Sequence, residues 1–154
     1  MKLLELALTW MHGLSAAAWF GAIVYRTFTV DPKAKSFLTS PTDYEGFSVH
    51  LAHKMRYVVS VGIFTCGLSG FALAGLTWNG ETDARAMLLG LKIVAWIAAL
   101  LLFLHVSYVH WPWRSLADPA EFPSYQRRAF QLACGMIALS GFGFLLGQAC
   151  RFVS

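Results

Sequence analysis

Charged residues are scarce in this 154-residue chain. They make up 13% of the sequence, whereas hydrophobic residues make up 57% and the mean hydropathy is +0.56. A soluble domain carries charges at about a quarter of its positions, so the composition excludes an ordinary soluble domain. The net charge of +4 comes mostly from predicted loops and gives no reason to expect a nucleic-acid partner.

Paired cysteines and hydrolytic motifs are also missing. Cys66, Cys134 and Cys150 form no CxxC pair, and neither a GxSxG nor a P-loop motif occurs. Glu5 is the only acidic residue near the predicted membrane depth. The sequence therefore gives no indication of hydrolytic or phosphoryl-transfer chemistry.

Four long apolar stretches account for most of the chain, at about residues 4–28, 56–78, 86–111 and 129–150. About 20 helical residues cross the ~30 Å hydrocarbon core, and backbone polar groups inside a bilayer must be satisfied internally. The sequence predicts an all-α four-helix transmembrane bundle, with residues 1–154 forming a single integral-membrane domain. The first stretch is too long for a signal peptide and is predicted to be a retained helix.

Basic residues predict the orientation, because cytoplasmic loops carry an excess of Lys and Arg. Most of them follow the first and third stretches: Arg26, Lys33, Lys35, Lys54, Arg56, Arg114, Arg127 and Arg128. Both termini are therefore expected on the outer, periplasmic side. The predicted location is a bacterial inner (cytoplasmic) membrane.

Short patterns predict details of the helices. Pro41 and the capping-box-like run Thr42-Asp43-Tyr44-Glu45 predict that the second helix begins near residue 42, before its apolar stretch. Small residues at four-residue spacing predict close helix packing or a slot for a flat cofactor. They are Gly13, Ala17 and Gly21, then Gly62, Cys66, Gly70 and Ala74, then Gly143 and Gly147. No internal repeat is evident.

Histidines lie inside or at the edges of three stretches. His12 and His105 fall at predicted membrane depth, where a polar side chain usually has a function, and His53 lies near the cytoplasmic interface. A hydrogen bond to a neighbouring helix and ligation of a metal are the two interpretations of such imidazoles. Lys92 is close enough to the outer end of its stretch to snorkel towards the interface.

Haem b is the cofactor that this pattern favours. Zinc and copper sites need three or four clustered ligands, whereas haem b needs one or two axial ligands and an apolar slot. We predict His12, His53 and His105 as haem-iron ligands, and Arg56 as a contact for a haem propionate or a quinone. At ~1.5 Å per residue, His12 and His105 differ in depth. His53 therefore pairs better with His105, and His12 would serve a second haem or none.

A family resemblance supports this reading. The segment His12-Gly-Leu-Ser-Ala-Ala-Ala-Trp19-Phe20-Gly21 resembles the first helix of the CopD-like and HemJ-like family of small membrane proteins, and Leu91-Lys92 resembles the opening of that family's third helix. The resemblance implies a four-helix, haem-binding scaffold, and the family includes a protoporphyrinogen oxidase. The Asn-Glu-x-Pro-like start of the oxidase's fourth helix is absent, which argues against porphyrinogen oxidation.

The sequence thus predicts a membrane cytochrome b with one or two haems. It would exchange electrons with a quinone or a redox partner protein, alone or as a subunit of a larger membrane complex. Two alternatives stay open: a protoporphyrinogen oxidase of the HemJ type, and a cofactor-free structural subunit. The chain is therefore an oxidoreductase, a redox subunit or neither, in each case with the lipid bilayer as a partner.

Overall fold

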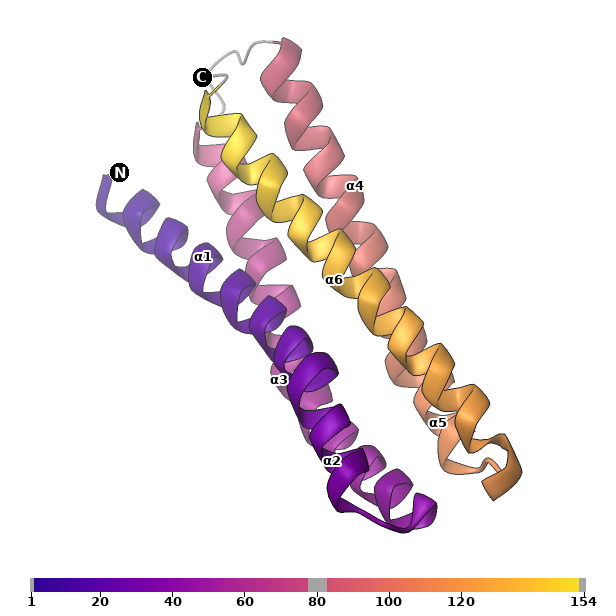
Figure 1. Cartoon of the computed structure of the whole chain (residues 1–154). Helices are drawn as coiled ribbons and strands as arrows, with labels where there is room; N and C mark the ends of the chain where they lie inside the picture. The colour runs from indigo at the N-terminus through magenta and orange to yellow at the C-terminus, as the bar shows by residue number, and fades with distance from the viewer. Residues whose placement is uncertain (1, 78–82, 153–154) are drawn as a thin grey trace.

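The computed structural model describes residues 2–77 and 83–152, and every regular element in these residues is helical. Four helical segments are long and apolar enough to cross a membrane (Figure 1). The all-α four-helix bundle is thus confirmed, and the chain is a multi-pass membrane protein. Trp78, the last residue of the predicted second span, lies outside the described residues, and the orientation of the termini stays a prediction.

The first half of the chain forms two antiparallel rods. α1 (Lys2–Tyr25) continues through the π-helical turn η1 (Arg26–Val30) into the short α2 (Asp31–Phe37). α3 (Pro41–Thr77) then runs back along α1. α3 begins well before its apolar stretch, so its first turns form part of a polar end of the molecule.

The second half repeats this plan. α4 (Asp83–His105) continues through the π-helical turn η2 (Val106–His110) into α5 (Trp111–Ser115). After the 3-10 turn η3 (Pro119–Glu121), α6 (Phe122–Phe152) runs back along α4. We call the end with α2 and α5 the loop end and the opposite end, where both termini lie, the terminal end (Figure 1).

The start of α3 was predicted correctly, but its cap was not. α3 begins at Pro41, and the Ser40 hydroxyl lies 3.4 Å from the Asp43 backbone N–H, which donates to it. Thr42 is already inside the helix. Glu45, which a capping box would turn back to the helix start, instead reaches a buried arginine, described below.

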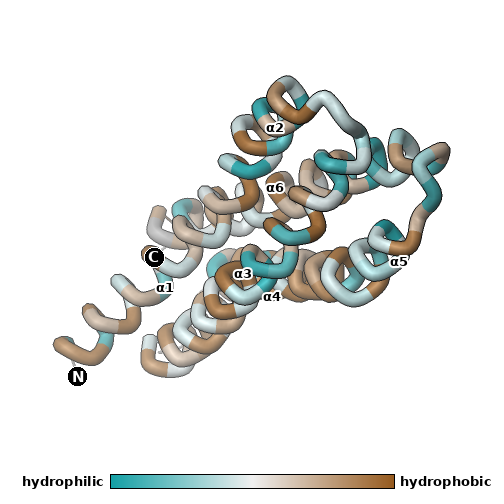
Figure 2. Tube along the Cα trace, turned by 90° about the horizontal axis from the view of Figure 1, so that it is seen from below, coloured by the Kyte–Doolittle hydropathy of each residue, from teal (hydrophilic) through white to brown (hydrophobic). Residues whose placement is uncertain are grey.

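The core lies where the two rods of each half meet those of the other. Its buried members are Trp19, Ile23, Val59, Ile63, Ala99, Phe103 and Met136. Many large apolar side chains point outward instead, as in spans whose solvent is lipid rather than water. Figure 2 shows that hydrophilic residues gather around α2, α5 and the turns beside them.

Side chains of neighbouring helices pack against the predicted small-residue face of α3, but none packs against the glycines of α1. A Cβ at Gly62 would lie 3.0 Å from the Trp19 Cβ, and the Trp96 indole lies directly over Gly67. Trp96 Nε1 also donates to the Ile63 carbonyl at 3.1 Å. By contrast, an added Cβ would meet nothing within 4 Å at Gly13, Gly21 or Gly143. Large side chains of α1 and α4 therefore pack directly against the glycines of α3.

The two halves correspond at an offset of 80 residues. η1 and η2 match at this offset, and each is followed by a proline, Pro32 or Pro112, at the second position of the next helix. Ser60 and Ser140 also match, and each hydroxyl donates to the carbonyl four residues earlier at 2.7 Å. The sequence reading found no repeat, because few residue identities survive between the halves.

Burial follows the same correspondence. The equivalent pairs Trp19 and Ala99, Ile23 and Phe103, and Thr27 and Ser107 are all buried. Matching positions thus face the shared core in both halves. The fold is therefore two helix-turn-helix units that run in the same order, each from the terminal end to the loop end and back (Figure 1).

We expect Ile63→Ala to lower the free energy of unfolding by about 2–5 kcal/mol, because Ile63 is 0% exposed and its truncation leaves a cavity. Ile97, which is 43% exposed, provides the control. Ile97→Ala should change stability by about 0.5 kcal/mol or less. Unfolding of both variants in mixed micelles, followed by circular dichroism, measures the difference, and equal losses would contradict this core assignment.

Candidate functional site

His12 is held in one orientation by α3. Its Nδ1 lies 2.9 Å from the Cys66 carbonyl oxygen and 3.3 Å from the Ser69 hydroxyl. Because a carbonyl only accepts, Nδ1 carries the proton and Nε2 keeps a lone pair. A Cβ at Gly70 would lie 3.0 Å from the His12 ring, so the absence of a side chain at Gly70 makes room for the ring. This bears out the hydrogen-bonded interpretation of His12, and the orientation also suits a metal ligand.

Lys92 partners the free nitrogen of His12. Its Nζ lies 3.3 Å from His12 Nε2, beside Gly147 of α6, where a Cβ would be 3.3 Å from the ammonium. The contact joins all four long helices. The expectation that Lys92 snorkels outward was wrong, because the side chain turns into the bundle. Among the described residues Lys92 has no carboxylate partner.

His12 and Lys92 are equivalent residues of the two halves, 80 positions apart. The contact therefore links corresponding positions of the two halves. The sequence analysis did not predict this contact. Only the correspondence of the two halves at an offset of 80 residues could have suggested it.

A buried ion pair joins the halves at the loop end. Arg114 donates to both carboxylate oxygens of Glu45, from Nε at 2.7 Å and from Nη2 at 3.0 Å, and Gln126 Nε2 donates to the same carboxylate at 2.7 Å. Glu45 and Arg114 are only 5% and 4% exposed. A bidentate, charge-assisted contact of this kind is strong and directional. The sequence reading missed it, because nothing local links residues so far apart.

Trp111 extends this network. The guanidinium carbons of Arg26 and Arg114 lie 4.9 Å and 4.6 Å from the centre of its ring, within cation–π range. Arg26 also donates to the Ser48 carbonyl at 3.3 Å and pairs with Asp31 at 3.6 Å. Both halves of the chain thus contribute an arginine to one indole.

Two contacts fix the register of α3 against the antiparallel α4–α5 rod. Glu45 meets Arg114 near the loop end, and the Ile63 carbonyl meets Trp96 nearer the middle. The interval between the contacts is equal on the two rods, from 45 to 63 and from 96 to 114. The interval on the α4–α5 rod includes the π-helical turn η2, so equal residue counts do not give equal lengths along the two rods.

The Glu45–Arg114 and Ile63–Trp96 contacts place His53 opposite Val106, whereas the Arg56 guanidinium, 5.4 Å from the centre of the Tyr108 ring, places His53 opposite Trp111. At about 1.5 Å per residue, His53 and His105 therefore lie within about two helical turns of each other in height. His53 and His105 are exposed, and within residues 2–77 and 83–152 neither ring makes a hydrogen bond.

The three predicted ligands do not form one cluster. His12 lies towards the terminal end, away from His53 and His105, and the described residues contain no group of three or more His, Cys, Asp or Glu placed to hold a metal ion. His110, near the predicted interface, is buried beside Tyr125 with ring centres 5.8 Å apart. The structure therefore places His53 and His105 apart from the His12–Lys92 contact inside the bundle.

No protein-family model matches this chain, and no curated protein or solved structure is similar to it.

Glu45→Ala should lower the free energy of unfolding by about 3–5 kcal/mol, because it leaves the Arg114 guanidinium buried without its carboxylate. Asp43→Ala removes an exposed carboxylate two residues away and is the matched control. Chemical unfolding in micelles gives both values. A loss for Glu45→Ala no larger than that for Asp43→Ala would show that the ion pair does not hold the halves together.

Proposed function

We propose that the chain is a small membrane cytochrome b in which His53 and His105 hold one haem b between α3 and α4. The observation that carries the proposal is that both histidines are exposed on neighbouring rods and that neither ring makes a hydrogen bond within the described residues. Two such imidazoles could hold one haem iron. The preference for His53 with His105 rests on their similar predicted depth.

The donor set at this position fits a haem. Both imidazoles are unpartnered within the described residues, and a neutral imidazole is the common axial ligand of haem iron. Arg56, one turn from His53, presents a guanidinium that can bind a propionate. A bound haem supplies one-electron transfer. The residues of the chain hold the iron, orient the ring and neutralise its carboxylates.

His12 has a different place in this proposal. Its Nε2 already accepts from Lys92, so a second haem at His12 would first require Lys92 to move away. We therefore assign the first haem to His53 and His105 alone. The outward position of this pair suits electron exchange with a quinone in the bilayer or with a redox partner protein, in a bacterial inner membrane.

The visible spectrum of the purified protein tests the ligand assignment. We expect His53→Ala and His105→Ala to lose the reduced-minus-oxidised haem bands, because each removes an axial nitrogen. His12→Ala should keep them. His50→Ala removes an exposed histidine one turn earlier on α3 and is the matched control.

Three outcomes would overturn the assignment. Loss of the bands in His12→Ala but not in His53→Ala would move the haem to the other histidine. Unchanged bands in all variants would exclude every predicted ligand. A parent protein without haem bands would favour the cofactor-free structural subunit.

A second candidate function, a protoporphyrinogen oxidase of the HemJ type, is favoured by one observation. His12 and Lys92 lie in the two motifs that resemble that family, and they touch at 3.3 Å. An imidazole lone pair beside an ammonium can accept and donate protons, while a quinone would take up the electrons removed from a bound substrate.

If the chain is this oxidase, Lys92→Met should abolish protoporphyrin formation in a complementation assay by removing the donor. The haem bands should stay, because Lys92 is not a ligand. Lys54→Met, at an exposed lysine, should keep the activity. Absence of complementation by the parent chain would reject the oxidase and leave the cytochrome proposal intact.

A further inference from the structure

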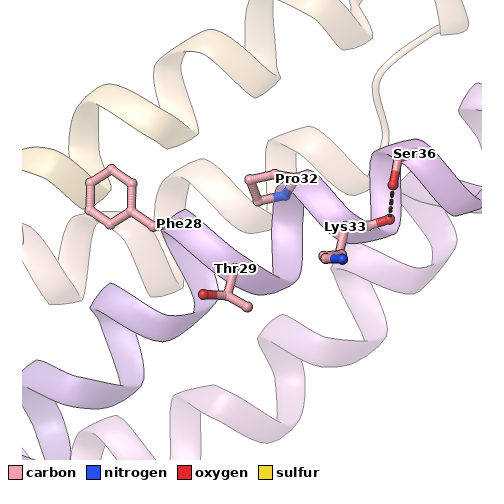
Figure 3. Close-up of a pocket in the computed structure, with 5 residues that line it drawn as sticks. All are labelled: Phe28, Thr29, Pro32, Lys33 and Ser36. Atoms are coloured by element: carbon pink, nitrogen blue, oxygen red, sulfur yellow. Dashed lines mark hydrogen bonds between the residues drawn. The ribbon is translucent and has the colours of Figure 1, made fainter.

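Two shallow grooves, both wide open to the surroundings, flank the loop end of the first rod. One has a volume of about 300 Å³ and is lined by residues of η1 and α2, namely Phe28, Thr29, Pro32, Lys33 and Ser36 (Figure 3). The other has a volume of about 390 Å³ and lies between this segment and α3. Thr29 and Lys33 line both grooves. They therefore form a shared polar ridge.

The ridge presents groups that bind an anion. Thr29 and Lys33 are exposed and four residues apart, so the hydroxyl and the ammonium lie on one helix face. Within the described residues Lys33 has no carboxylate partner, because Asp31 pairs with Arg26 at 3.6 Å. The Ser36 hydroxyl donates to the Lys33 carbonyl at 2.8 Å, so its hydrogen is already used. Thr29 and Lys33 thus remain as donors.

The second groove is apolar and aromatic. Tyr25, Phe37 and Phe47 contribute to its walls, and Phe37 is 89% exposed. This segment ends the first membrane-spanning stretch, Lys2–Phe37. Aromatic side chains at such a boundary lie among lipid headgroups and upper acyl chains. A ligand that suits the whole surface is therefore an amphiphile with a negative head and an apolar tail.

We propose that this surface is a binding site for an anionic phospholipid. The phosphate lies on the Thr29 hydroxyl and the Lys33 ammonium, and an acyl chain follows the aromatic groove. The unpaired charge selects an anionic head over a zwitterionic one. The site is independent of any haem, since none of its residues contributes to the proposed haem ligands.

Native mass spectrometry of the full chain tests the proposal. The protein is released from nanodiscs that contain equal amounts of phosphatidylglycerol and phosphatidylcholine. We expect the parent to retain phosphatidylglycerol preferentially and Lys33→Gln to retain about five-fold less, the effect of one basic residue at an anionic membrane surface. Thr29→Val should also reduce retention, without changing the net charge.

The matched control is Lys54→Gln, which removes an exposed lysine of α3 that lines neither groove. It should retain the lipid as the parent does. Equal losses for Lys33→Gln and Lys54→Gln would reduce the effect to general surface charge and overturn the site. Equal retention of both lipids by the parent, or a change of oligomeric state in Lys33→Gln, would overturn it too. Lys33 and Thr29 are exposed, so both variants are expected to fold.

Discussion

Directional polar contacts between the two helix pairs are the constraint on which the rest of this fold depends. Lipid tails are as apolar as leucine, so apolar faces alone give helices little reason to associate in a bilayer. α1 pairs with α3 and α4 with α6, and the pairs are joined by the His12–Lys92 contact inside the bundle and by Glu45, Arg114 and Gln126 at the loop end. With both ends joined, the register between α3 and α4 is set.

The π-helical turns belong to the same plan. Each adds a residue to the helical turn and so changes the direction of the side chains that follow it, and such turns occur often at functional sites. Here η2 begins directly after His105 and ends at the buried His110, while η1 begins at Arg26 and leads to Lys33. Without η2, Trp111 and Arg114 would face other directions. The turns therefore separate the membrane-facing part of each rod from its polar end.

The sequence predicted the spans well, because a span depends on local hydropathy alone. It also predicted the start of α3, whereas the pairing of His53 with His105 stays a prediction. It failed for Lys92, whose direction depends on the rotation of α4 about its own axis, and for Thr42 and Glu45, because a distant arginine competes with the local cap. Helices with small and apolar residues on every side do not specify their rotation. The correspondence between the halves escaped notice because it is carried by burial, two prolines and two serines rather than by a shared motif.

The contact between corresponding positions of the two halves also has a consequence for how such a molecule can be assembled. Two copies of the first half, joined in the same way, would oppose two imidazoles. Two copies of the second half would oppose two ammonium groups in a poorly solvated place, where like charges repel. Only one copy of each sets a proton donor against an acceptor. The peptide link between the halves supplies one copy of each.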